Sequence, residues 1–284
     1  MKKLDSVSFD AFLREKSPLA CDSGCFDLRE FDLITPAALV QLATACYAMA
    51  GDGRRPRIMT EKESVRGYLQ RCGFVNVIAG VAGIEPAIRY PRLGQYNSLR
   101  GSNPMLIEVT RIASGIDLPD LLDRIVWVLR YRLKYHKHDA FDVTTAVSEI
   151  CQNTFDHNSG TAGFIAMQVY GQGANRFLEI GVSDYGDGLI TTLQRNPKNG
   201  TIPSDLDAIK MAMQLGTSEY DDPTRGTGLY HLLEITYKHA GSIQIKSGSA
   251  KVRYRMDKRE GWAFAVSSVP GVHVALTLPT KDRS

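Results

Sequence analysis

Between residues 104 and 284 the spacing of hydrophobic positions changes along the chain. Apolar residues three and four positions apart predict amphipathic helices, and the expected helices are Leu118–Tyr135, Asp139–His157 and Leu229–His239. Alternating or short apolar runs predict strands, and the expected strands are Met105–Ile112, Gly163–Tyr170, Phe177–Asp184, Ile243–Lys246, Lys251–Met256, Trp262–Val266 and Val272–Leu278. Helices followed by strands favour an α+β fold with a layer of helices on a sheet.

Residues 1–84 contain shorter elements of both kinds. Thr35 and Pro36 are residue types that favour a helix N-cap and first turn, and Gly51 and Gly53 would end that helix. The elements expected after it are a strand, a helix and a strand, over Pro56–Thr60, Glu61–Arg71 and Phe74–Ile78. This alternation predicts a small α/β domain over 1–84, followed by a linker over 85–103 and a second domain over 104–284.

Composition narrows the classes of protein to consider. The chain is 43% hydrophobic, as in a globular protein, and its net charge of +3 is too small to bind nucleic acid by charge alone. No apolar run reaches the length of about 20 residues needed for a membrane span, and the charged N-terminus does not resemble a secretion signal. We therefore expect a cytoplasmic protein without membrane or nucleic-acid partners.

The five scattered cysteines predict reduced structural thiols, because no second close pair completes a zinc site.

Polar side chains border the apolar stripe of the predicted helix Asp139–His157. The stripe contains Val143, Val147, Ile150 and Thr154, and the adjoining arc contains Glu149, Asn153, Asp156 and His157. Acidic and amide side chains usually face solvent, so a solvated helix face is the alternative interpretation. Their position at the edge of the core indicates a cleft.

Asp184 continues the inward apolar row of the strand in FLEIGVSDYGDGL. A buried carboxylate needs a specific donor, and Gly186 and Gly188 would let the backbone approach a ligand closely. The alternative interpretation is an aspartate that only forms a turn at the end of a strand.

A third motif, TRGTGLYHLL, opens directly into a predicted helix. The N–H groups at a helix N-terminus bind phosphate well, although a glycine-rich turn can also simply begin a helix.

Together, the three motifs resemble those of the GHKL ATPases in type and order. SEICQNTFDHN is similar to their N box, SDYGDGL to their first glycine box and TRGTGL to their second. The resemblance covers about residues 105–279 and implies a Bergerat-type sandwich with a mixed β-sheet, and ATP and Mg²⁺ as cofactors.

The resemblance also implies roles for individual residues. Asn153 would bind Mg²⁺, Glu149 would orient or deprotonate the attacking water or hydroxyl, and Asp184 would accept a hydrogen bond from the adenine amino group. Residues 189–225 would form a lid over ATP. The implied nucleotide-binding residues are Asn153, Asp156, His157, Asp184, Gly186, Gly188, Thr217, Ser218, Gly226, Thr227, Gly228 and Leu229. The last strand departs from the family pattern, because Val272 stands where a threonine often helps to hold the adenine.

Among the branches of this family, the compact size and the helix pair before Asn153 are most similar to the anti-sigma-factor serine kinases. Residues 1–84 weakly resemble a STAS domain, but Pro36 and Ala37 occupy the place of its phosphorylatable serine. We therefore expect this domain to be a regulatory or docking module.

The expected function is an Mg-ATP-binding regulatory protein that hydrolyses ATP or phosphorylates a serine or threonine of a partner protein. A non-catalytic ATP-gated switch is the alternative, a degenerate fold without ligand is a third, and homodimer formation stays open.

Two further groups are predicted to face solvent. His136 and His138 lie at a junction between two predicted helices, without the hairpin that carries a phospho-accepting histidine in sensor kinases. Lys251, Arg253 and Arg255 alternate along one strand, which predicts a solvated hairpin face, with an acidic or nucleic-acid partner as the alternative.

Overall fold

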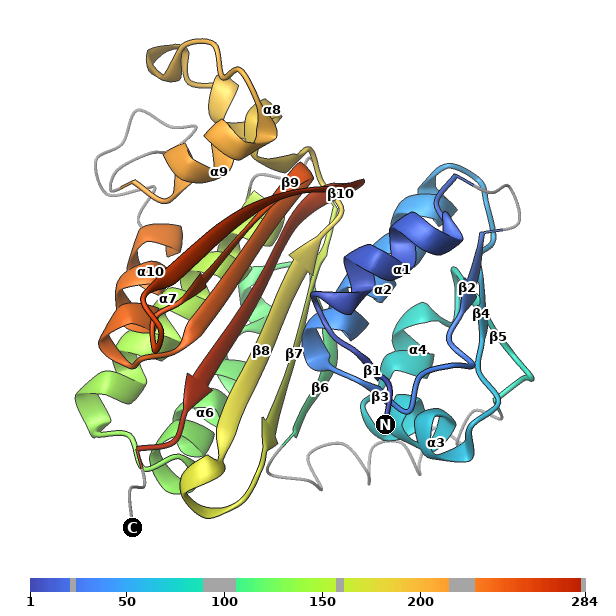
Figure 1. Ribbon diagram of the computed structural model, residues 1–284, viewed down its shortest axis with the longest axis horizontal. Helices are drawn as coiled ribbons and strands as arrows, with labels where there is room; N and C mark the ends of the chain where they lie inside the picture. The colour runs from blue at the N-terminus through green and yellow to red at the C-terminus, as the bar shows by residue number, and fades with distance from the viewer. Residues whose placement is uncertain (21–23, 89–105, 157–160, 215–227, 282–284) are drawn as a thin grey trace.

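The computed structural model describes residues 1–20, 24–88, 106–156, 161–214 and 228–281, and Figure 1 shows the arrangement of its elements. The helices are α1 Ser8–Lys16, α2 Pro36–Gly51, α3 Glu63–Arg71, α4 Phe74–Ile78, α6 Pro119–Trp127, α7 Lys137–Asp156, α8 Gly188–Gln194, α9 Asp205–Ala212 and α10 Gly228–Lys238. The strands are β1 Lys3–Leu4, β2 Cys25–Asp27, β3 Leu33–Ile34, β4 Arg57–Met59, β5 Gly83–Glu85, β6 Leu106–Ile112, β7 Gly163–Tyr170, β8 Phe177–Asp184, β9 Ser242–Arg255 and β10 Glu260–Pro279. The fold is of the α+β class, as expected.

A five-stranded sheet of order β6-β7-β8-β10-β9 forms the centre of the molecule. Each neighbouring pair of these strands is antiparallel, so the expectation of a mixed sheet is wrong for the part of the chain that the structure describes. Short connections explain this, because β7 and β8, and likewise β9 and β10, follow one another through tight turns that can join only antiparallel neighbours. Parallel pairing occurs in the N-terminal region, between β1 and β3 and across β2-β4-β5.

The long strands β9 and β10 are sharply bent. An extended strand of the 14 residues in β9 would span about 45 Å. However, the N–H of Met256, just after β9, donates to the carbonyl of Gly241, just before it, at 2.9 Å. β9 therefore turns back on itself near Gly248, and the pairing of β10 with β9 shifts register between Ala265 and Val272. The four short strands expected here correspond to the four arms of β9 and β10.

The turn of β9 corrects one expectation. Of the predicted solvated basic row, Lys251 is only 5% exposed, because α1 covers this part of β9 and binds its ammonium group. Arg253 and Arg255 are half-buried.

One face of the sheet packs against α6, α7 and α10. Their amphipathic faces and the inward residues of the strands form one apolar core, which includes Val143, Val147, Leu178, Ile180, Val182, Leu232, Val274 and Leu276. The stripe predicted for residues 139–157 is thus confirmed, and α7 supplies it. The helix predicted over Leu118–Tyr135 is α6 followed by a π-helical turn over Val128–Arg132.

The opposite face of the sheet is covered by the N-terminal region. The helix α2 begins at Pro36, as predicted, and packs on β7 and β8. It is apolar nearly all round, as expected of a helix enclosed on all sides. Its core cluster also includes residues from the sheet, namely Leu106, Val109, Phe164, Ala166 and Val269. The two predicted domains therefore share one hydrophobic core.

One predicted strand is wrong. Residues Phe74–Ile78 form the short helix α4, because a five-residue apolar run fits a buried helical turn as well as a strand. Gly73 before it has φ +72°, so α3 is followed by a glycine in the left-handed conformation.

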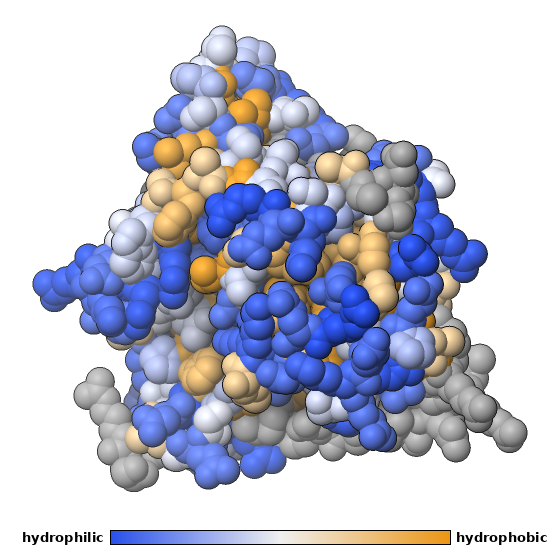
Figure 2. Space-filling model, turned by 45° about the vertical axis from the view of Figure 1, so that its right-hand side comes forward, coloured by the Kyte–Doolittle hydropathy of each residue, from blue (hydrophilic) through white to orange (hydrophobic). Residues whose placement is uncertain are grey.

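The surface is largely hydrophilic in the view of Figure 2, where apolar residues form small separate patches. Within the described residues, no helix has both the length and the apolar character needed to cross a membrane.

Candidate functional site

The C-terminal half of α7 carries the polar arc predicted from the sequence. Its apolar stripe is buried through Ile150 and Thr154, while Asn153 and Asp156 are exposed. The side chain of Glu149 lies between these extremes, with 29% exposure. Residue His157 lies outside the described residues. The helix therefore presents carboxylate and amide oxygens at the border between core and solvent.

Asp184, at the end of β8, is 4% exposed and continues the row of Ile180 and Val182, as predicted. One carboxylate oxygen, Oδ1, accepts the N–H of Gly186 at 2.9 Å, and Oδ2 accepts the N–H of Val272 at 3.3 Å. The predicted donors are thus main-chain groups. An ionised carboxylate can accept about four hydrogen bonds, and these two orient it against the main chain.

The end of α7 and the end of β8 meet through Gly163 of β7. Gly163 pairs with Asp184 in the β7–β8 ladder, and a Cβ atom at Gly163 would overlap the side chain of Thr154 on α7. The structure therefore brings Thr154, and with it the neighbouring Asn153, to the end of the sheet where Asp184 lies.

The first glycine segment packs against the turn of β9 and against β10. The N–H of Leu189, directly after Gly188, donates to Oγ of Ser247 at 2.9 Å. Gly271 has φ +79°, and a Cβ atom there would overlap the main chain of Asp184, so only glycine fits. Three separate segments thus converge around Asp184.

The N-terminus of α10 lies beside Glu149. A Cβ atom at Gly228 would lie 3.2 Å from Cβ and 3.4 Å from Oε2 of Glu149, and Leu229 is buried. The second glycine motif therefore meets the predicted N box at this point. Thr217, Ser218, Gly226 and Thr227 lie outside the described residues, as do residues 215–225 of the predicted lid.

His231 was not predicted from the sequence. Its Nδ1 lies 3.6 Å from Oε2 of Glu149, because residue 231 is one helical turn beyond Gly228 and faces the same side of α10. That spacing was the available signal. A histidine here can donate a hydrogen bond to the carboxylate that the family resemblance assigns as catalytic.

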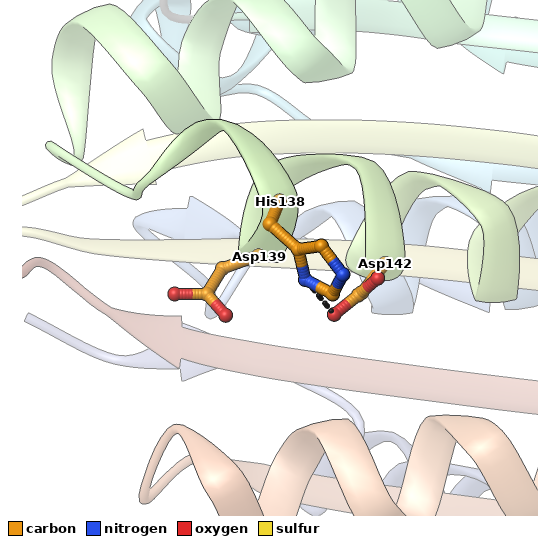
Figure 3. A group of neighbouring side chains, drawn as sticks. All are labelled: His138, Asp139 and Asp142. Carbon is orange, nitrogen blue, oxygen red and sulfur yellow. Dashed lines mark ion pairs between the residues drawn. The ribbon is translucent and has the colours of Figure 1, made fainter.

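A second polar cluster lies at the start of α7, where His138, Asp139 and Asp142 offer ligand atoms within 4.8 Å of one another. Figure 3 shows the imidazole of His138 directed at the carboxylate of Asp142, with an Nδ1–Oδ2 distance of 3.0 Å. The ammonium of Lys238 on α10 lies 2.6 Å from Asp139 and 3.3 Å from Asp142. Because this cation already pairs with both carboxylates, the cluster fixes the end of α10 to α7 and does not indicate a metal site. His138 is 84% exposed, as predicted.

A groove of about 840 Å³ lies along the outer side of α7 and α10. Its lining consists of Asp142, Thr145, Ala146, His231, Leu233, Glu234, Ile235, Tyr237, Lys238, Tyr254 and Met256. Of the groups described above, it includes His231 and part of the Lys238 cluster but not Asp184. It therefore shares His231 with the candidate site but is not lined by Asp184.

The described cysteines Cys25, Cys46, Cys72 and Cys151 are free thiols. Burial raises the pKa of Cys72 and of Cys151 to about 12, so both stay protonated at neutral pH. They are structural thiols, as predicted.

The chain matches no protein-family model and no curated protein. The evidence for a function therefore consists of the residues themselves and their geometry.

Proposed function

We propose that this protein is an Mg-ATP-binding regulatory protein of the GHKL type, with a Bergerat-like C-terminal half, a STAS-like N-terminal region and a cytoplasmic location. The observation that carries the proposal is Asp184. Its buried carboxylate ends an apolar row, is oriented by two main-chain N–H groups, and lies at the end of the sheet that α7 reaches through Gly163. A fixed acceptor in an apolar setting suits the amino group of adenine.

The other described residues fit the phosphate end of such a ligand. Asn153 offers an amide oxygen, and Mg²⁺ prefers oxygen ligands, so Asn153 would hold the ion. The bound ion would neutralise phosphate charge. The N-terminus of α10 at Gly228 favours anions, and it lies against Glu149, which would orient or deprotonate the attacking hydroxyl. His231 would position the Glu149 carboxylate through their 3.6 Å contact.

The first test is calorimetry with Mg-ATP on the wild type and on Asp184→Asn. Hydrogen bonds to charged groups contribute about 1.5–3 kcal/mol, so the variant is expected to bind about 10–100-fold more weakly. Asp187→Asn is the matched control, because Asp187 belongs to the same motif but is exposed and paired with Arg195. Equal binding by both variants would exclude Asp184 as the adenine acceptor.

The second test separates catalysis from simple binding. Glu149→Gln is expected to retain Mg-ATP binding and to lose turnover by about 10²–10⁴-fold, the usual contribution of a general base. If wild-type protein binds ATP but shows no hydrolysis or transfer, a non-catalytic switch is the function. The hydrophobic core shared by the N-terminal region and the sheet favours the non-catalytic switch as a second candidate function. A conformational change in the sheet would alter its packing against the N-terminal region directly.

If the protein transfers phosphate, the acceptor is expected on a partner protein. Thr35 is the hydroxyl nearest to the STAS phosphorylation position, and it is fully buried against the sheet. Mass spectrometry after incubation with Mg-ATP should find no phosphate at Thr35.

A further inference from the structure

At three positions of the candidate site, the residue adjacent in sequence on the same strand faces the N-terminal region. Successive residues of a strand point to opposite faces of a sheet. The pairs are Asp184 and Ser183 on β8, Val272 and His273 on β10, and Ser247 and Lys246 on β9. Ser183, His273 and Lys246 are register partners across the three strands, so they form one row directly behind the site.

This row ends in a buried charge cluster. Asp10 of α1 forms ion pairs with both Lys246 and Lys251, and the side chains of all three are at most 10% exposed. The two lysines lie together because β9 turns back between them. Lys251 also donates to the carbonyl of Ser6 at 3.4 Å. A buried charge is stable only when paired, so Asp10 fixes the position of this turn.

The opposite side of the same turn is held by α8 and α9. Oγ of Ser247 accepts the N–H of Leu189 at 2.9 Å. The carboxylate of Asp205, at the start of α9, accepts both the N–H and the hydroxyl of Ser249, at 2.8 Å and 2.7 Å. The β9 turn, residues 246–251, thus lies between α1 and the segment that begins in the candidate site.

We propose that α1 is an internal regulator of the nucleotide site, and that docking of Asp10 on the β9 turn and binding of nucleotide beside Asp184 favour each other. The inference rests on the proposed function for the identity of the ligand. The physical reason is that both events stabilise one arrangement of the β9 turn. When α1 is docked, Asp10 holds Lys246 in place, and with it the adjacent Ser247. Ser247 in turn holds the N–H of Leu189. The start of α8 therefore keeps the geometry that nucleotide binding needs. Linkage requires the coupling to be equal in both directions.

The test uses two variants of the full chain with the same chemistry. Lys246→Met and Lys251→Met each leave Asp10 with one lysine, so both variants retain a one-to-one buried ion pair. Only residue 246 is next to Ser247. We expect the Kd of Mg-ADP, measured by calorimetry, to rise about 5–50-fold in Lys246→Met, in the usual range of coupling between sites. In Lys251→Met it should change less than twofold.

A second readout reports on α1 itself. Mg-ADP should slow amide hydrogen exchange in α1 of the wild type and of Lys251→Met, but not of Lys246→Met. Asp205→Ala, which releases the β9 turn from its other side, should also abolish this protection and provides a second variant if Lys246→Met folds poorly. Circular dichroism checks folding of each variant.

A further control tests whether loosening the N-terminal region anywhere has the same effect. The hydroxyl of Tyr68 donates to Gln168 at 2.8 Å, five residues along β7 from Gly163 and about 17 Å from the site end. Tyr68→Phe should leave the Kd of Mg-ADP unchanged.

The outcomes are distinct. If the wild type gives no heat with Mg-ADP or Mg-ATP, the proposed function is overturned, and this inference with it. If the wild type binds but Lys246→Met and Lys251→Met bind equally well, or Tyr68→Phe weakens binding as much as Lys246→Met, the coupling is overturned while the proposed function stands.

Discussion

The two faces of the central sheet are buried by different chemistry. Apart from Asp184 at the end of β8, residues facing α7 and α10 are apolar, as in Leu178, Ile180, Val182, Val274 and Leu276. Residues facing the N-terminal region include buried polar and ionisable groups, namely Glu179, Ser183, Lys246, Lys251 and His273. Apolar contacts tolerate small shifts, whereas buried charges need specific partners. The helix face is therefore held by apolar packing, whereas the N-terminal face adds a few specific pairs to its shared apolar core.

Glu179 illustrates the second kind of contact. Burial raises the pKa of its carboxyl group, and the Thr35 hydroxyl partly opposes this. The carboxylate accepts the N–H of Ala37 at the start of α2, at 3.3 Å, where the helix dipole favours negative charge. The sheet thus binds the N-terminus of α2 through the carboxylate of Glu179.

The largest expected effect comes from Asp10→Ala, which leaves two buried lysines without their anion. Breaking a buried ion pair costs about 3–5 kcal/mol, comparable to the 2–5 kcal/mol expected for Leu276→Ala on the helix face. Urea denaturation measures both. Replacing the cluster together, with Asp10→Leu, Lys246→Met and Lys251→Met, should restore most of the stability. A loss that persists in this triple variant would show that packing, and not charge, attaches α1.

Next in size is Gly181→Ala on β8. A Cβ atom at Gly181 would lie 2.5 Å from Cα of Ala37, and backbone cannot move aside cheaply, so we expect a loss of about 2–3 kcal/mol in thermal or urea unfolding. Gly83→Ala on β5 is the control, because its added methyl group would meet no atom within 4 Å. Equal losses in the two variants would mean that α2 does not press on the sheet.

A smaller effect is the pH dependence of stability, to which both faces contribute. Burial, reinforced by Lys246 and opposed by Asp10, lowers the pKa of His273 to about 3, whereas an unfolded histidine titrates near 6.5. Between these values the unfolded chain binds a proton that the folded chain does not, so stability falls as pH falls, by about 1.4 kcal/mol per unit. Burial, with Lys281 beside it and Asp139 opposing, lowers the pKa of His239 on the helix side to about 4, with the same sign.

Urea unfolding between pH 7 and 5.5 checks this expectation. The raised pKa of Glu179 acts in the opposite sense, because its folded-state carboxyl group binds a proton more readily. His273→Gln should remove about half of the slope, and His239→Gln the other half. An unchanged slope in His273→Gln would mean that His273 is protonated in the folded protein.

The smallest expected effect is that of Tyr68→Phe, which removes one hydrogen bond to Gln168. A loss of about 1 kcal/mol is expected, the usual contribution of such a bond. A loss above 3 kcal/mol would show that this end of the N-terminal face carries more of the attachment than the Asp10 cluster.

Local patterns predicted much of the helix face. β7 and β8 have the predicted bounds, and α7 carries the predicted apolar stripe. Periodicity was sufficient here because each of these elements contributes an apolar row to one core. The short run at Phe74–Ile78 was too brief to distinguish helix from strand, and strand direction in the sheet depends on connections that periodicity does not report.

The N-terminal face could not be predicted for a related reason. In the alternation of β8, Glu179 and Ser183 occupy positions that would ordinarily face water. Only the packing of α2 and α1 makes them buried. Likewise, the alternation of Lys251 with Val252 was correct, but the partner of Lys251 lies 241 residues away at Asp10. For Asp184, in contrast, the sequence predicted both burial and a donor, because the row before it was apolar.

The hydrophobic core shared by α2 and the sheet has a practical consequence for anyone dividing this protein into pieces. A fragment beginning near residue 104 would expose Phe164, Ala166 and Val109 to water, and a fragment ending near residue 84 would lose the surface that encloses α2. Each half is expected to aggregate when produced by itself. Co-expression of both should reconstitute a soluble heterodimer, held together without any covalent connection between the halves.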